Sequence, residues 1–181
     1  NLEKLVLLPD KIDKNPLLTI AIPSYNASKF LQKCLLSIIK SKYLGKLEIL
    51  IINDGSKDNT KEIGLYFEKL LNNNVRKIVI LVDKENGGHG SGINKGIELA
   101  TGKYFRVVDS DDWIDTNAFD TYIEKLQNED ADEILTDYCE ARTFEDKLYP
   151  KETFKFMNEN IMYNVNDICS GIYGFREWGP S

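Results

Sequence analysis

Residues 77–113 read KIVILVDKENGGHGSGINKGIELATGKYFRVVDSDDW. The apolar run at 77–82 predicts a strand, and the glycine-rich loop at 86–92 leads into a predicted helix at 93–100. A second β-rich run at 104–108 ends at three carboxylates within four residues. A strand, a helical crossover and another strand in this order predict a βαβ unit with parallel strands.

The preceding sequence repeats this pattern twice. LLTIAIP at 17–23 predicts a strand, and apolar residues at helical spacing follow between 30 and 38. LEILIIN at 47–53 predicts another strand, followed by a tight turn at 54–56 and a helix through 63–71. We therefore expect a Rossmann-like α/β fold, with an open, mostly parallel sheet and helices on both faces. The apolar character of the second and third strands predicts burial on both of their faces.

The carboxyl-terminal part gives weaker signals. A helix is predicted near 116–126 and a strand near 132–141, and weakly alternating extended segments follow to 156. Residues 158–181 have aromatics and glycines without clear periodicity. We expect an amino-terminal extension at 1–16, a core at 17–130, and at 131–181 the start of a further region that continues beyond the chain.

Composition excludes several classes of protein. The net charge is −6, the sequence pI is about 4.9 and there is no basic block, so nucleic acid is not an expected partner. The apolar runs are far shorter than the ~20 residues that a membrane span needs, and the amino terminus has no features of a signal peptide. Three cysteines without CxxC spacing fit a reducing cytoplasm.

Polar residues follow all four predicted strands. In parallel α/β sheets, ligands bind beyond the carboxyl ends of the strands. Four loops should therefore meet at one edge of the sheet, and they comprise residues 24–26, 54–56, 86–92 and 109–112.

The acidic loop is the most informative of the four. Asp109, Asp111 and Asp112 repel one another unless water, cations or a metal offset their charge. Mg²⁺ and Mn²⁺ favour carboxylate oxygens and commonly bridge to diphosphate oxygens, so a metal bound together with a diphosphate is the functional interpretation. The alternative is a solvated acidic turn that caps the next helix.

The other loops are more ambiguous. The glycines at 87–92 allow close approach of a phosphate to a helix start, although Gly88-x-Gly90-x-Gly92 is also similar to a dinucleotide or methyl-donor loop, which normally opens the first βαβ unit. His89 could contact a phosphate or a sugar. Asp54 could accept hydrogen bonds from a base or a ribose, or it could simply form a turn.

Aromatic residues add two further candidates. Tyr25 and Asn26 follow Pro23, and they could stack on and hydrogen-bond a nucleobase or form a plain turn. Trp113 could contact a sugar or serve in packing.

Taken together, TIAIPSYNASKFLQKCLLSI, EILIINDGSKDNT and NGGHGSGINKGIELATGKYFRVVDSDDW resemble the amino-terminal half of family 2 glycosyltransferases of the GT-A fold. The resemblance spans roughly residues 17–127. It implies an inverting enzyme that transfers a sugar from a nucleotide diphosphate, favouring UDP, to an acceptor hydroxyl with the help of Mg²⁺ or Mn²⁺. It makes 17–130 a nucleotide-sugar-binding core and 131–181 the start of an acceptor-side region.

The resemblance also implies roles for individual residues. The first base-binding loop would comprise Pro23, Tyr25 and Asn26, and the acid that contacts the nucleobase would be Asp54. The two acids of the DxD motif would be Asp109 and Asp111. Asp111 would bind the metal, Asp109 would support the ribose or the metal, and Asp112 would share that role. The loop bordering the donor would supply Gly88, His89 and Asn94, although the family often has an arginine here and this loop does not.

The catalytic base is the missing part. The family's base is an Asp or Glu downstream of the DxD motif, and Asp137, Asp167 and Glu177 match no motif. We therefore expect the base to lie outside this chain. One alternative is a donor-binding module or an inactive relative without a base. Another is a sugar nucleotidyltransferase, but it would need a glycine-rich, basic loop where this chain has PSYNAS.

Partners and setting also follow from the resemblance. We expect a glycan or lipid-linked acceptor and a role in bacterial cell-envelope polysaccharide synthesis. The expected location is the cytoplasm, including the inner face of the membrane.

Overall fold

The computed structural model describes residues 8–72, 75–142, 147–151 and 161–162. The chain divides into two compact units, residues 1–129 and residues 130–181. The strands of the first unit are β1 (Leu18–Ser24), β2 (Leu47–Asp54), β3 (Val79–Lys84) and β4 (Tyr104–Val107). Its α-helices are α1 (Leu31–Ile39), α2 (Thr60–Leu71), α3 (His89–Leu99) and α4 (Thr116–Leu126), and a short 3₁₀ helix, η2 (Leu44–Lys46), precedes β2.

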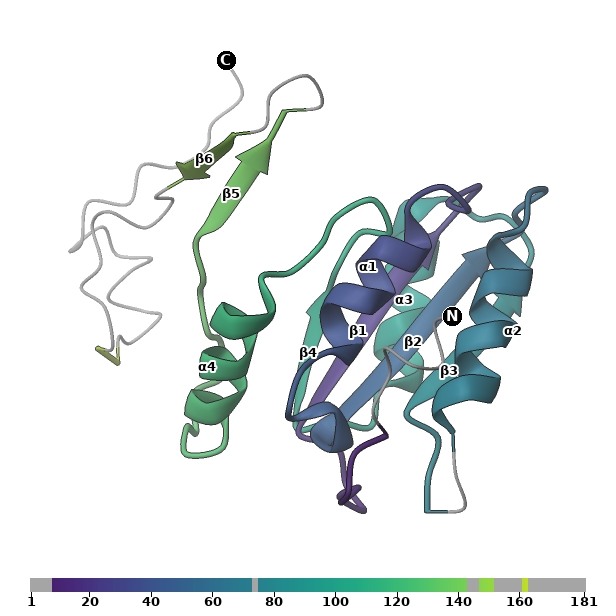
Figure 1. The fold of residues 1–181 in the computed structure, drawn as a ribbon. Coiled ribbons are helices and arrows are strands. Elements are labelled where there is room, and N and C mark those ends of the chain that lie inside the picture. The colour runs from purple at the N-terminus through teal and green to yellow at the C-terminus, as the bar shows by residue number, and fades with distance from the viewer. Residues whose placement is uncertain (1–7, 73–74, 143–146, 152–160, 163–181) are drawn as a thin grey trace. The chain divides into compact units, whose positions relative to one another are not determined.

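The four strands form one parallel sheet in the order β3-β2-β1-β4. In Figure 1, α1 and α2 cover one face of this sheet and α3 covers the other. The predicted open parallel sheet with helices on both faces is therefore confirmed. The chain crosses from the β3 edge to the opposite edge through α3, so the carboxyl ends of β1 and β4 lie side by side. Such a reversal of strand order is where α/β sheets place their ligands.

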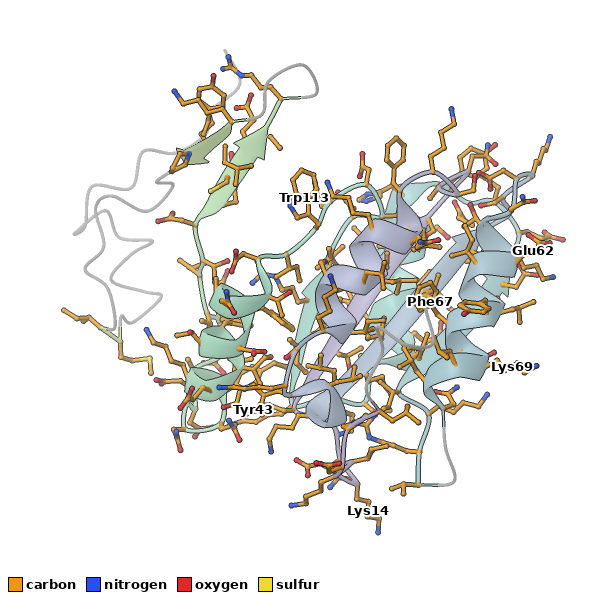
Figure 2. All side chains as sticks on the ribbon, in the orientation of Figure 1. Lys14, Tyr43, Glu62, Phe67, Lys69 and Trp113 are labelled. Atoms are coloured by element: carbon orange, nitrogen blue, oxygen red, sulfur yellow. The ribbon has the colours of Figure 1, made fainter. Side chains whose placement is uncertain are left out.

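The two central strands and the inner sides of the helices make up the core. Every residue of β1 and β2 is buried. Helix α1 adds Leu31, Cys34, Leu35, Ile38 and Ile39. Figure 2 shows the same division on α2, where Phe67 points toward the sheet while Glu62 and Lys69 lie on the outward side.

Helix α3 packs against β1 through two glycines. A Cβ atom on Gly96 would lie 2.6 Å from Cβ of Ala21, and one on Gly92 would lie 3.2 Å from Cβ of Pro23. Both distances are shorter than ordinary van der Waals contact, so glycine at these positions lets the helix backbone approach the strand.

A buried polar cluster closes the amino end of the sheet. The carboxylate of Glu48 on β2 accepts hydrogen bonds from the hydroxyls of Thr19 at 2.6 Å and Thr101 at 2.7 Å, and from the Thr101 amide at 2.9 Å. The Gly102 amide donates to the Thr19 hydroxyl at 2.9 Å. These bonds tie β1 and β2 to the connection between α3 and β4.

Three of the sequence predictions differ from the structure. Helix α3 begins at His89, four residues before the predicted start, so part of the supposed loop is helical. Strand β3 lies at an edge of the sheet and most of its residues are only half-buried, so full burial on both faces was wrong. Of the strand predicted at 132–141, only β5 (Tyr138–Ala141) forms.

The second unit contains one described hairpin. In it, β5 pairs antiparallel with β6 (Leu148–Lys151), and Glu140 forms ion pairs with Lys151 at 3.0 Å and Arg142 at 3.2 Å. Across the described ranges, no helix combines the length and the apolar character that a membrane crossing requires.

Candidate functional site

Hydrogen bonds connect the loops at the carboxyl edge of the sheet. The loop after β1 bonds to the turn after β2, that turn bonds to the glycine loop before α3, and α3 reaches the acidic loop after β4. The predicted convergence of four polar loops at one edge is therefore present. We call these loops the rim: residues 24–28, 54–58, 85–92 and 109–113.

Asn26 joins the first two loops. Its backbone amide donates to the Ser56 hydroxyl at 3.0 Å, and its side-chain oxygen accepts from the Lys57 amide at 2.8 Å. Its φ of 50° is left-handed, a conformation that asparagine adopts more readily than most residues. Tyr25 beside it is 52% exposed, while Pro23 is buried against α3.

Asp54 organises the glycine loop. Oδ1 accepts from the Gly87 amide at 2.9 Å and from the Lys84 ammonium, and Oδ2 accepts from the Gly88 amide at 2.8 Å. Burial would by itself raise the pKa of Asp54, but the hydrogen bonds from Lys84, Gly87 and Gly88 outweigh it, and the pKa is lowered. The carboxylate is therefore ionised at neutral pH although its residue is only 3% exposed.

Two of the glycine amides consequently point inward. We expected the loop to offer its backbone to a phosphate, yet the Gly87 and Gly88 amides already donate to Asp54. Gly88 precedes the first residue of α3 and has a φ of 83°, which a side chain would disfavour.

His89 links α3 to the acidic loop. Its Nε2 lies 2.7 Å from Oδ1 of Asp109, and both side chains are about half exposed. Asn94, the third residue expected at this border, lies exposed farther along α3.

Residues of helix α1 contact the acidic loop and the residue that follows it. The Cys34 thiol donates to the Asp109 carbonyl at 3.7 Å, and the Ser37 hydroxyl accepts from the Ile114 amide at 3.0 Å. The Lys33 ammonium lies 3.2 Å from the centre of the Trp113 ring, a cation–π contact. Figure 2 shows Trp113 on the connection to α4, beside α1, and the side chain is 42% exposed.

The acidic loop has the electrostatics of crowded carboxylates. Partial burial raises the pKa of Asp112, and the neighbouring Asp111 and Asp109 raise it further. Burial and the same three carboxylates raise the pKa of the Cys34 thiol to about 12, so this cysteine stays protonated. Asp111 is exposed at the rim.

The three carboxylates lie on one short loop. Within the part of the chain that the structure describes, no three His, Cys, Asp or Glu side chains are gathered closely enough to hold a metal ion on their own. Exposed carboxylates on one short loop suit a hard divalent ion that takes its remaining ligands from water and phosphate. The residues therefore fit an ion held jointly with a diphosphate, and they do not form a closed protein cage.

A hollow of about 480 Å³ opens at the outer side of the rim, where β2 and β3 end. It is lined by Asn53, Gly55, Ser56, Lys61, Asp83, Lys84 and Glu85. Asp83 accepts from the side-chain amide of Asn53 at 2.7 Å and from the Lys61 ammonium at 2.5 Å. The hollow is therefore polar and of mixed charge.

Sequence reasoning missed several residues that hold this site together. Lys84, Cys34 and Ser37 lie on a strand and a helix that looked structural, and Ser56 lies in a predicted loop in which only Asp54 was given a role. Strand pairing could have identified Lys84, since in-register β2 and β3 place it opposite Asp54. Among the candidate bases, Asp137 lies in the second unit just before β5, and Asp167 and Glu177 lie outside the described residues.

The sequence profile described as "Glycosyl transferase family 2" matches residues 19–177, most of the chain. The chain belongs to glycosyl transferase family 2. The match includes every rim residue and extends into the second unit.

Curated family 2 relatives are longer proteins. Glycosyltransferase GlyG of Streptococcus pneumoniae is 36% identical over 67% of this chain and 39% of its own length. GlyA of the same organism is 33% identical over 91% of this chain and 21% of its length. The hyaluronan synthase of Pasteurella multocida is 37% identical over 68% of this chain and 12% of its length. The chain thus spans between about an eighth and two fifths of these relatives.

Solved structures agree on the fold. Residues 1–349 of S. aureus TarS superpose with a TM-score of 0.54 at 24% identity, over 61% of this chain and 32% of that one. The same TarS fragment has also been solved in complex with UDP-GlcNAc, with a TM-score of 0.54. The GT-A fold expected from the resemblance is confirmed.

Proposed function

We propose that this chain is the donor-binding part of a metal-assisted, inverting glycosyltransferase that uses a nucleotide-diphosphate sugar, with UDP as the favoured nucleotide. The observation that carries the proposal is the hydrogen-bonded rim, in which the loop with Tyr25 and Asn26, the ionised Asp54 and the acidic loop lie along one edge of the sheet. Family membership supports the reaction class. The structures of TarS with UDP and UDP-GlcNAc support the choice of nucleotide.

In this proposal, each side of the rim binds one part of the donor. Tyr25, which is exposed, would stack on the base, while Asn26 and Asp54 would border it. His89 and the acidic loop would lie beside the diphosphate. Asn94 would border the donor from α3.

Asp111 and Asp109 would hold Mg²⁺ or Mn²⁺, with Asp112 beside them. Such an ion supplies charge neutralisation for the departing diphosphate. His89 would keep Asp109 oriented through their 2.7 Å contact. This matters because a carboxylate that is already oriented does not lose conformational freedom when the donor binds.

The acceptor would bind outside the rim. We propose a glycan or lipid-linked acceptor, a catalytic base outside this chain and a role at the cytoplasmic face of the membrane. The second candidate is a donor-binding module or an inactive relative that performs no transfer, because Asp137 is the single described candidate base and it lies in the second unit, away from the rim's loops in sequence.

Calorimetric titration of the purified chain with UDP, GDP, ADP and UDP-GlcNAc, with and without Mn²⁺, tests the proposal. We expect UDP and its sugar conjugate to bind only with Mn²⁺, and Asp111→Asn to weaken this binding at least about tenfold, or ~1.4 kcal/mol. Glu98→Gln, which removes an exposed carboxylate from α3, is the matched control and should bind normally. Equal binding with and without metal, or by Asp111→Asn and the unaltered chain, would contradict the proposed metal site.

A further inference from the structure

Lys84 lies beside the rim and bonds to Asp54, although no sequence motif marks it. It is the last residue of β3, and the β2–β3 register places it opposite Asp54. Its ammonium donates to Oδ1 of Asp54 and, at 2.6 Å, to the carbonyl of Glu85. The side chain is 21% exposed, so solvent screens this ion pair only partly.

Asp54 has little hydrogen-bonding capacity left for a ligand. An ionised carboxylate offers about four acceptor positions. Lys84, Gly87 and Gly88 take three of them. The most direct consequence of this carboxylate is therefore the placement of the loop that leads into α3, and one acceptor position remains for a base or ribose.

The turn that carries Asp54 and the glycine loop also fit closely against each other. Gly55 has a φ of 70°, and a Cβ atom there would lie 2.8 Å from the Asn86 amide nitrogen. Side chains therefore cannot be added at this contact without moving the loop. Removing the Lys84 charge would hold the Asp54 carboxylate less firmly and so weaken its anchoring of the Gly87 and Gly88 amides. The glycine loop would then become more mobile beside the proposed donor.

We infer that Lys84 is a positioning residue of the donor site, which acts through Asp54 to hold the Gly87–Gly88 segment and the start of α3 in place. The inference rests on the proposed donor site, because the consequence for function is preorganisation of the loop beside the diphosphate. Loss of the anchor would require the loop to be ordered each time the donor binds, and this ordering lowers affinity.

The test compares Lys84→Met with Lys84→Arg and Lys46→Met in the whole chain. Lys46 is a matched control, because it pairs with Asp13 at 2.7 Å with a side chain 28% exposed, and the amino end of β2 follows it. Backbone amide exchange of Gly87 and Gly88, measured by NMR without ligand, reports on the anchor. UDP affinity measured with Mn²⁺ reports on its effect at the site.

In Lys84→Met, we expect the amide hydrogens of Gly87 and Gly88 to exchange roughly tenfold faster or more, because the Asp54 carboxylate that accepts them is held less firmly. We also expect this variant to bind UDP about tenfold more weakly. Lys84→Arg, which keeps the charge, should restore most of both. Lys46→Met should change neither quantity.

Unchanged exchange in Lys84→Met would overturn the inference. Faster exchange with unchanged UDP affinity would overturn the positioning role and leave a purely structural ion pair. If the unaltered chain does not bind UDP at all, the proposed function fails, while the exchange rates still decide whether Lys84 anchors the loop.

Discussion

Asp58 joins two loops of the rim through one carboxylate. It accepts from the Ser28 amide at 3.0 Å and from the Thr60 amide at 3.0 Å, and the Thr60 hydroxyl donates to it as well. Burial would by itself raise the pKa of Asp58, but the hydrogen bonds from Thr60 and Ser28 lower the pKa to about 2. The ionised form is therefore the one that stabilises the folded chain.

Asp58→Asn should destabilise the chain at neutral pH and matter progressively less in acid. The folded pKa lies below the ordinary value of 3.8, so the carboxylate's contribution is complete above about pH 4 and is lost as pH falls toward about 2. The measurement is urea unfolding at pH 7, 4 and 2.5. Glu124→Gln, at an exposed site on α4, is the control. A stability difference for Asp58→Asn that is the same at pH 7 and pH 2.5 would contradict this assignment.

Helix α3 depends on glycine in two distinct ways. Near its start, Gly88 supplies a positive φ that lets the chain turn into the helix. Farther along, Gly96 allows the helix to approach β1, because any Cβ there would collide with Ala21. The same residue type therefore serves backbone conformation at one place and packing at the other.

Gly96→Ala should lower the free energy of unfolding by roughly 1–3 kcal/mol, because the added methyl group would overpack the contact with Ala21. Gly90→Ala is the matched control, since nothing lies within 4 Å of a Cβ added there and alanine favours a helix by up to about 1 kcal/mol over glycine. Denaturant unfolding of the two variants checks this prediction. An equal or higher stability for Gly96→Ala would show that α3 can shift on the sheet without cost.

The bounds of three strands were predicted closely and the start of α3 was not, for a physical reason. The apolar runs of β1 and β2 reflect burial, which the local sequence records, and the predicted bounds of β1, β2 and β4 agree with the structure to within one residue. The start of α3 depends on Asp54, more than thirty residues earlier, accepting the Gly88 amide. A local pattern of glycines cannot reveal such a partner, so residues 89–92 resembled a loop.

The location of the site was predictable from the sequence, but the hydrogen bonds between its residues were not. Parallel strands bring their carboxyl ends together, so the loops with Asn26, Asp54, His89 and Asp109 had to meet. Which of them bond to each other depends on side-chain geometry. The contact between His89 and Asp109 and the support of Asp109 by Cys34 were accessible only from the structure.

The two ends of the sheet differ in what their polar groups do. At the amino end, the Glu48 carboxylate is buried and bonded to Thr19 and Thr101. At the carboxyl end, Tyr25, His89 and Asp111 are exposed around an ionised aspartate. Polar groups that are buried and satisfied stabilise a fold, whereas exposed groups that converge on a strand edge are available to a ligand. The sheet therefore has one structural end and one candidate binding end.

The central claim is that the donor binds at the rim, and amide shift mapping by NMR tests it most directly. On addition of UDP with Mg²⁺ to the labelled chain, we expect the largest shifts at the rim, residues 24–28, 54–58, 85–92 and 109–113. Residues 45–48 and 100–103, at the amino end of the sheet, should not change. The account would be contradicted by shifts concentrated at the amino end, or by no shifts anywhere at saturating nucleotide and metal.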